Sequence, residues 1–181
     1  MSRLTEAYAI DRLRRGLVGV NATEGVFGLC GRAFDLSACA RIGALKRRST
    51  DKSFIVVVAD FSQIESVVKF SSTEFMALPK NTYGAETWIL PASAIAPSWL
   101  LSTAGTIGVR VTRHPQFARL CKAAGPLVST SANLPGRSPA LNLLRARRYF
   151  ADKVDFYLPG RLINPGRVST IRDARTSNII R

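Results

Sequence analysis

Four basic residues lie within one stretch of seven, residues 46–52, in the first third of the chain. Lys46, Arg48 and Lys52 share this stretch with Arg47, a serine, a threonine and an aspartate. Converging cations of this kind can hold a triphosphate and stabilise the charge that develops at the α-phosphate during adenylation. The same run is typical of a solvated helix C-terminus, where basic side chains complement the helix dipole. The spacing alone leaves both interpretations open.

Two further polar segments are rich in hydroxyl groups or glycine. Residues 129–133 read Ser-Thr-Ser-Ala-Asn, and their hydroxyls, amide and backbone N–H groups can bind phosphate oxygens. Residues 21–28 carry Thr23 and Glu24 beside two glycines, which let the backbone approach a ligand closely. Each segment is also compatible with an ordinary turn. Both follow predicted strands, and ligands gather at the carboxyl ends of strands in open α/β sheets.

Several common signatures of other enzyme classes are absent. The sequence contains neither a Walker A motif nor Gly-x-Gly-x-x-Gly. A Ser-His-Asp hydrolase would have to use His114, the single histidine, whose place before Pro115 favours helix capping instead. The cysteines are far apart, without metal-type spacing, which indicates reduced thiols and no zinc site; they are Cys30, Cys39 and Cys121.

The chain is strongly basic: 26 Lys and Arg against 12 Asp and Glu give a formal net charge of +14 over 181 residues. This excess indicates a polyanionic partner, although a basic surface that only aids solubility is the alternative. One cluster, Arg145, Arg147 and Arg148, is assigned to RNA binding. The longest apolar run, residues 54–59, is far too short to cross a bilayer, and no signal peptide is visible. We therefore expect a soluble, cytoplasmic protein with no membrane partner.

Hydrophobic periodicity and punctuating residues predict the elements that position these segments. Helices are expected over about residues 1–15, from Asp35 to near Lys46, at 60–69, at 73–78, and from Pro115 to the stop at Gly125-Pro126. Strands are expected at 17–20, 54–58, 87–90, 107–111, 127–128, 155–158, 168–172 and 178–180.

Two of these strands carry further information. Residues 54–58 are apolar throughout, which is typical of a strand buried on both faces. Residues 107–111 alternate, so that Arg110 points to the face opposite its apolar neighbours. The alternation of strands and helices predicts an α/β fold with a twisted, mixed, open sheet. Because no linker interrupts the pattern, we expect one domain over residues 1–181.

Five motifs occur in a fixed order along the chain. They are Thr-Glu-x-Val-Phe-Gly-Leu from Thr23, Lys-x-Arg-x-x-x-Lys from Lys46, Val-Arg-Val-x-x-His-Pro from Val109, Ser-Thr-Ser-Ala-Asn from Ser129, and Ser-Thr-Ile-Arg-Asp from Ser169. In this order they resemble the YrdC/TsaC family of threonylcarbamoyl-AMP synthases, in its short single-domain form. The resemblance extends from about Leu17 to Arg181.

The resemblance implies a fold, a reaction and partners. The family fold is a twisted mixed α/β sheet with flanking helices around a large basic cavity. The family reaction joins L-threonine and bicarbonate, then displaces pyrophosphate from ATP to form threonylcarbamoyl-AMP. A tRNA-threonylcarbamoyl transferase complex then passes the group to the adenosine at position 37 of tRNA. Mg²⁺ is expected through the ATP phosphates rather than a protein metal site.

The motif matches also imply residue roles. Lys46 and Arg48 are expected to be catalytic, and Thr23 and Arg110 to bind threonine. ATP is expected to contact Lys46, Arg48, Lys52, Ser129, Ser131, Asn133, Ser169 and Arg181.

The chain departs from the family pattern in two places. Where the family has Tyr-Pro before Thr-Glu, this chain has Asn21-Ala22, which we expect to alter the pocket wall. Where the family has Trp-Pro-Gly-Pro-x-Thr, residues 82–87 read Thr-Tyr-Gly-Ala-Glu-Thr. An inward-facing Glu86 would weaken ATP binding.

Two other functions remain open from the sequence. The first is a non-catalytic protein of the same fold that binds tRNA or double-stranded RNA, or acts in ribosome maturation, since phosphate contacts dominate RNA affinity. The second is an ATP-dependent carbamoylating enzyme that uses a different amino acid.

Overall fold

The computed structural model describes residues 3–47, 53–79 and 85–180. Its helices are α1 (Arg3–Arg14), α2 (Leu36–Leu45), α3 (Ser72–Ala77), α4 (Pro115–Ala124) and α5 (Leu143–Phe150). Its strands are β1 (Gly19–Ala22), β2 (Phe27–Arg32), β3 (Ile55–Val58), β4 (Glu86–Pro91), β5 (Thr106–Val111), β6 (Leu127–Ser131), β7 (Phe156–Tyr157) and β8 (Thr170–Asp173). Single turns of 3-10 helix lie at Phe61–Gln63, Glu65–Val67 and Ser98–Leu100.

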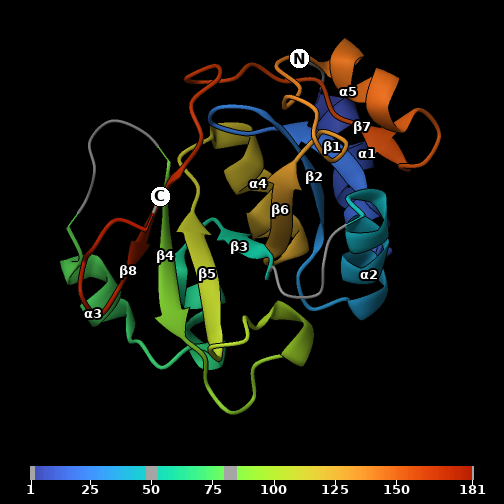
Figure 1. Ribbon diagram of the computed structural model, residues 1–181. Helices are drawn as coiled ribbons and strands as arrows, with labels where there is room; N and C mark the ends of the chain where they lie inside the picture. Colours follow the sequence, from blue (N-terminus) through green and yellow to red (C-terminus); the bar gives the residue numbers. More distant parts are fainter. Residues whose placement is uncertain (1–2, 48–52, 80–84, 181) are drawn as a thin grey trace.

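The strands form one mixed sheet in the order β7-β1-β2-β6-β3-β5-β4-β8. β7 with β1, β3 with β5, and β4 with β8 are parallel, and the other neighbours are antiparallel. In Figure 1, α2 and α5 lie near β1 and β2, whereas α3 lies beside β4 and β8. The predicted α/β class with an open mixed sheet and flanking helices is confirmed.

Each face of the sheet packs against its own apolar cluster. The larger cluster includes Ile42 of α2, Phe150 of α5 and Val109 of β5. The smaller cluster lies on the other face, where α1 and α4 contribute the fully buried Leu13 and Phe117. β3 contributes side chains to both clusters, which explains its continuous apolar sequence.

Side-chain caps define the starts of α2 and α4, as the sequence predicted. Asp35 accepts a hydrogen bond from a backbone N–H in the first turn of α2 at 3.0 Å, and the helix ends with Lys46 as its C-cap. His114 Nδ1 accepts the backbone N–H of Phe117 at 3.2 Å, and Pro115 follows as the first residue of α4. The capping role predicted for His114 is therefore confirmed.

Half of the polar segment at residues 21–28, which we expected to be a loop, belongs to the sheet. β1 continues to Ala22 and β2 begins at Phe27, so that only a tight turn separates them. Thr23 closes this turn by donating its backbone N–H and its hydroxyl to the carbonyl oxygen of Val26, at 3.0 and 2.7 Å. The sequence did not predict β2 because two glycines interrupt its strand pattern.

Other boundaries also differ from the predictions. Residues 60–69 form two 3-10 turns rather than a helix, the first capped by Asp60. α5 was not predicted; the side chain of Asn142 caps it by accepting the Arg145 N–H at 2.8 Å. The strand predicted at 178–180 is a single bridge between Arg172 and Ile179, because β8 offers a partner for only one residue pair.

Candidate functional site

A cavity of about 290 Å³ lies on the face of the sheet that α1 and α4 partly cover. The strand register fixes this placement, since Arg110 of β5 lies beside Val57 of β3, and Val57 belongs to the apolar cluster under α4. The polar residues that line the cavity are Thr23, Ser53, Thr87, Arg110, Ser129, Thr130, Ser131, Arg167 and Ser169. The cavity therefore collects hydroxyl groups and guanidinium groups from segments far apart in the sequence.

Lys46 is hydrogen bonded to the carboxyl end of β6. Its Nζ donates to the carbonyl oxygen of Ser131 at 2.9 Å, and to both the carbonyl oxygen and Oδ1 of Asn133 at 2.7 Å. Ser131 Oγ donates to the same Asn133 Oδ1 at 2.6 Å. The expected meeting of Lys46 with Ser131 and Asn133 is confirmed, whereas the contact of these residues with ATP stays a prediction.

Ser129 lies deeper along β6. Its side chain is buried, and within the part of the chain that the structure describes its Oγ has no hydrogen-bond partner. A Cβ added at Gly28 would lie 3.0 Å from Ser129 Oγ and 3.3 Å from Thr23 Cγ2. Glycine at this position therefore leaves space beside both hydroxyl-bearing side chains. The space beside Gly28 suits a ligand oxygen, and the contact between Ser129 and ATP stays a prediction.

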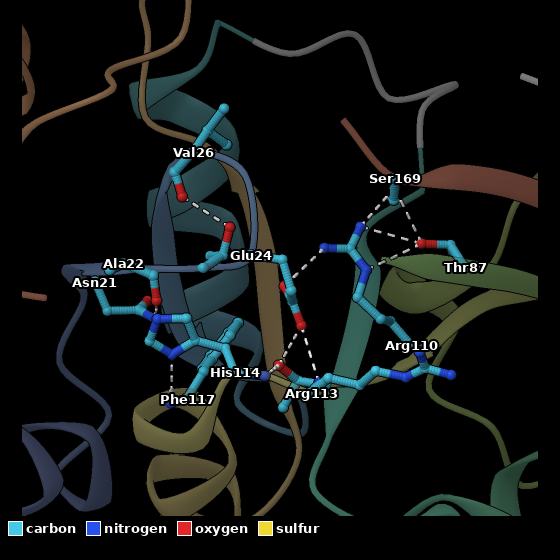
Figure 2. Close-up of polar contacts among 12 residues, drawn as sticks. Asn21, Ala22, Glu24, Val26, Thr87, Arg110, Arg113, His114, Phe117 and Ser169 are labelled. Carbon is cyan, nitrogen blue, oxygen red and sulfur yellow. Dashed lines mark hydrogen bonds and ion pairs between the residues drawn. The ribbon is translucent and has the colours of Figure 1, made fainter. Parts of the chain in front are cut away.

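Arg110 reaches the cavity from β5 and is held on several sides (Figure 2). Its Nε and Nη2 each donate to Thr87 Oγ1 at 3.1 Å, and Nη2 also donates to Ser169 Oγ at 2.7 Å. Nη1 lies 3.9 Å from Glu24 Oε2. The predicted orientation of Arg110 is confirmed. Ser169, which we expected to contact the nucleotide, is hydrogen bonded to Arg110.

Glu24 is the residue that the site prediction omitted. Its side chain is only 5% exposed, and Oε1 accepts hydrogen bonds from Thr112 Oγ1 at 2.6 Å and from the Arg113 N–H at 3.1 Å. Burial alone would raise the pKa of Glu24, but the Arg110 charge and these hydrogen bonds hold that pKa below its usual value. The carboxylate is therefore ionised at neutral pH. Its place in the Thr-Glu motif was the only sequence signal.

A strap formed by residues 161–168 crosses the turn between β1 and β2. The backbone N–H of Ile163 donates to the Glu24 carbonyl at 2.9 Å, and that of Gly166 donates to the Gly25 carbonyl at 2.9 Å. A Cβ at Gly25 would lie 1.7 Å from the carbonyl oxygen of Arg167. Only glycine allows this close approach, which brings Arg167 to the cavity.

Three predicted nucleotide contacts, Arg48, Lys52 and Arg181, lie outside the described residues. The cysteine thiols are buried and do not line the cavity. Burial raises the pKa of Cys30 to about 12, and burial together with the Asp35 charge raises that of Cys39 to about 12. Neither thiol is activated as a nucleophile. The arrangement favours chemistry by charge and positioning.

Comparison with known proteins places this geometry in a family. Residues 11–181 match the Sua5/YciO/YrdC family model, described as "Telomere recombination". The chain belongs to the Sua5/YciO/YrdC family. Threonylcarbamoyl-AMP synthase of Cellvibrio japonicus is 39% identical over 179 residues, covering 96% of this chain and 93% of the relative. That of Nitrosococcus oceani is 42% identical over 171 residues, covering 93% and 92%.

Solved structures of family members share the fold. A structure of P. abyssi Sua5 complexed with L-threonine superposes with a TM-score of 0.86 at 26% identity, over 96% of this chain and 52% of that chain. This chain thus spans about half the length of that protein. E. coli YciO superposes with a TM-score of 0.79 at 28% identity, over 94% of this chain and 84% of that chain.

Of the residues at the family departures, Ala85 lines the cavity, whereas Asn21 and Glu86 do not. Asn21 is fully buried in β1 and is not among the residues that line the cavity; its Nδ2 donates to the Ala22 carbonyl at 2.8 Å, and its Oδ1 has no hydrogen-bond partner among the described residues. Glu86 lies on the sheet face opposite Thr87 and forms an ion pair with Arg172 at 3.0 Å. Asn21 itself does not form part of the cavity wall, and the effect of replacing the family's Tyr-Pro on the pocket stays a prediction.

The arginines assigned to RNA binding lie on α5. Arg145, Arg147 and Arg148 are exposed. Arg145 Nε donates to Tyr149 OH at 3.1 Å, and the Arg147 guanidinium carbon lies 4.6 Å from the centre of the Tyr157 ring. Their RNA contact stays a prediction. None of the helices in the described ranges is both long and apolar enough to span a membrane.

Proposed function

We propose that this chain, acting as one domain over residues 1–181, forms L-threonylcarbamoyl-AMP and pyrophosphate from L-threonine, bicarbonate and ATP. The observation that carries the proposal is the meeting of Lys46 with Ser131 and Asn133 beside a cavity whose wall also holds Arg110. A cationic and hydroxyl-lined basin of this kind suits a triphosphate next to a small carboxylate. Relatives of similar length that carry the name threonylcarbamoyl-AMP synthase support this activity.

The proposed reaction has two bond-forming steps. The threonine amine forms an N–C bond with bicarbonate, and water is lost to leave a carbamate. A carbamate oxygen then bonds to the α-phosphorus of ATP, and the bond from that phosphorus to the β-phosphate oxygen breaks, so that pyrophosphate leaves with the electron pair. Negative charge grows on the phosphate oxygens during the second step, and preorganised donors beside them lower its barrier.

The described residues divide this work between two sides of the cavity. Lys46 supplies a fixed positive charge at the carboxyl end of β6, where Ser129 offers its hydroxyl to a phosphate oxygen and Ser131 can do so once its hydroxyl turns from Asn133 Oδ1. Arg110 lies on β5 and offers a guanidinium to the threonine carboxylate, with Thr23 nearby in the same wall. This arrangement would bring the amine and the α-phosphate together without a covalent enzyme intermediate.

Mg²⁺ and the downstream partners belong to the same proposal. Groups of three or more His, Cys, Asp or Glu that could hold a metal do not occur among the described residues. We propose that Mg²⁺ accompanies the ATP phosphates, where it neutralises charge on the leaving pyrophosphate. The product would pass to a tRNA-threonylcarbamoyl transferase complex in the cytoplasm, where ATP and tRNA are present.

The test is release of pyrophosphate from ATP with purified protein. We expect release that requires both threonine and bicarbonate, and a product with the mass of threonylcarbamoyl-AMP. Omitting each substrate in turn is the control, and serine in place of threonine tests amino-acid selectivity. Pyrophosphate release that is absent, or unaffected by threonine, would contradict the proposal. Salt-sensitive RNA binding without turnover would instead support the non-catalytic alternative.

A further inference from the structure

The buried carboxylate of Glu24 forms an ion pair with Arg110, a residue that lines the main cavity. Glu24 lines a second pocket of about 240 Å³ whose wall includes Phe61 and Trp88, whereas Arg110 lines the main cavity. The Glu24–Arg110 ion pair, drawn in Figure 2, therefore joins a residue of the second pocket to a residue of the main cavity. Glu24 is not among the residues that line the main cavity, whereas Arg110 is, so its carboxylate can act on a bound substrate through the guanidinium.

The two carboxylate oxygens of Glu24 have different surroundings. Oε1 receives hydrogen bonds from Thr112 and Arg113, which fix the carboxylate plane. Oε2 is buried and, among the described residues, makes no hydrogen bond; its nearest ionic neighbour is Arg110 Nη1 at 3.9 Å. A buried anion without a close donor is costly unless a charge compensates it. This geometry ties the position of the carboxylate to that of the guanidinium.

Thr87 and Ser169 hold the opposite edge of the Arg110 guanidinium. Their hydroxyls accept from Nε and Nη2 at 2.7–3.1 Å, but hydroxyls rotate and carry no net charge. They restrict the tilt of the group without opposing its positive charge. Glu24 supplies both a fixed direction and a counter-charge, because its own plane is already held by two donors.

We propose that Glu24 is a positioning residue that holds the Arg110 guanidinium in the orientation that receives the carboxylate of threonine. This inference rests on the function proposed above and adds to it a residue that does not touch substrate. Glu24 sets threonine affinity and leaves nucleotide affinity to Lys46 and the carboxyl end of β6. A small displacement of a substrate-binding group can cost about 100-fold in rate, so the effect is measurable.

The test compares Glu24→Gln with Glu86→Gln. Glutamine keeps the shape of Glu24 and can still accept the two hydrogen bonds at Oε1, but it presents no charge to Arg110. Glu86 is a matched control because it also forms a largely buried ion pair with an arginine, at 3.0 Å, on the opposite face of the sheet. Each variant removes one negative charge from an ion pair with an arginine.

For Glu24→Gln we expect KM for threonine to rise about tenfold or more, while KM for ATP changes less than about twofold. Glu86→Gln should leave both values at those of the wild type. In an Arg110→Met background, adding Glu24→Gln should raise KM for threonine no further, since the residue acts through Arg110. Equal rises in both KM values would indicate a structural role and overturn the proposal, as would no change.

Threonine binding measured by calorimetry separates this inference from the proposed function. If the wild type binds threonine but releases no pyrophosphate, the proposed function fails, and weaker binding by Glu24→Gln still supports the positioning role. If the wild type and Glu24→Gln bind threonine equally, the positioning role is wrong even when turnover is observed. A wild type that binds no threonine overturns the inference as well.

Discussion

Replacement of Lys46 by methionine removes one charge at the point where two distant segments meet. Methionine keeps most of the length of the side chain but donates nothing to the carbonyl groups of Ser131 and Asn133 or to Asn133 Oδ1. Each of the three bonds contributes on the order of 1 kcal/mol or less, because the ammonium is only partly buried and water competes for its acceptors. We therefore expect a loss of about 2 kcal/mol in the free energy of unfolding, seen as a fall of about 4–8 °C in Tm.

The catalytic effect of Lys46→Met should exceed its effect on stability. If the ammonium stabilises phosphate charge in the transition state, its loss costs about 3 kcal/mol, or roughly 100-fold in kcat. Threonine-dependent pyrophosphate release at saturating ATP, measured well below Tm, gives this number directly. Lys122→Met is the matched control, since it removes the same charge from an exposed position near the end of α4.

The outcome that refutes this reasoning is specific. Lys46→Met that turns over within about threefold of the wild type would show that the ammonium serves only to bind β6, and the phosphate site would have to be assigned elsewhere. A similar loss in Lys122→Met would show that overall charge, rather than the local contact, controls the rate.

Three further predictions concern other parts of the molecule. Glu24→Gln should lower the free energy of unfolding by about 3 kcal/mol at neutral pH. Burial raises the pKa of Glu24, but the Arg110 charge and the hydrogen bonds hold that pKa below its usual value, so the wild-type advantage should be complete above the ordinary glutamate pKa and should vanish as pH falls through the lowered one; an advantage that does not diminish as the pH is lowered would contradict the assignment. Gly25→Ala should lower Tm and raise KM for ATP or threonine, because its Cβ would displace the Arg167 carbonyl; unchanged Tm and kinetics would show that the strap yields freely. Replacing both Arg145 and Arg148 by alanine should weaken tRNA binding and reduce the slope of log K against log salt by about 2, without changing ATP affinity. Arg175→Ala, which lies beyond the opposite edge of the sheet, is the control. An equal loss of tRNA binding in Arg175→Ala would indicate a diffuse charge effect.

The chain-specific residues at the family departures now have a physical account. Glu86 joins β4 to β8 through Arg172, whose guanidinium carbon also lies 6.0 Å from the centre of the Trp88 ring. Its charge is therefore compensated on the face away from the main cavity. Asn21 keeps a buried amide in β1 and is not among the residues that line the main cavity. Neither residue removes a polar group from the cavity wall.

Local sequence determined much of the architecture. Asp35 and His114 could be recognised as helix starts because a cap bonds to its own first turn, which lies a few residues away. The burial of β3 followed from its continuous apolar sequence, and the placement of Arg110 on the face opposite Val109 and Val111 followed from side-chain alternation. The order of short motifs was sufficient to predict the family, and the predicted class of mixed α/β sheet is confirmed.

Tertiary structure decided which of these residues act together. Lys46 meets Asn133 across 87 positions, and Glu24 meets Thr112 across 88, through a sheet order that no local pattern specifies. The two glycines of β2 weaken its intrinsic preference for a strand, so the strand exists because β1 and β6 pair with it on both sides. Spacing along the chain could propose a cationic basin, but only the packing of distant strands brings Glu24 behind Arg110, because such contacts depend on long-range pairing rather than on neighbours in sequence.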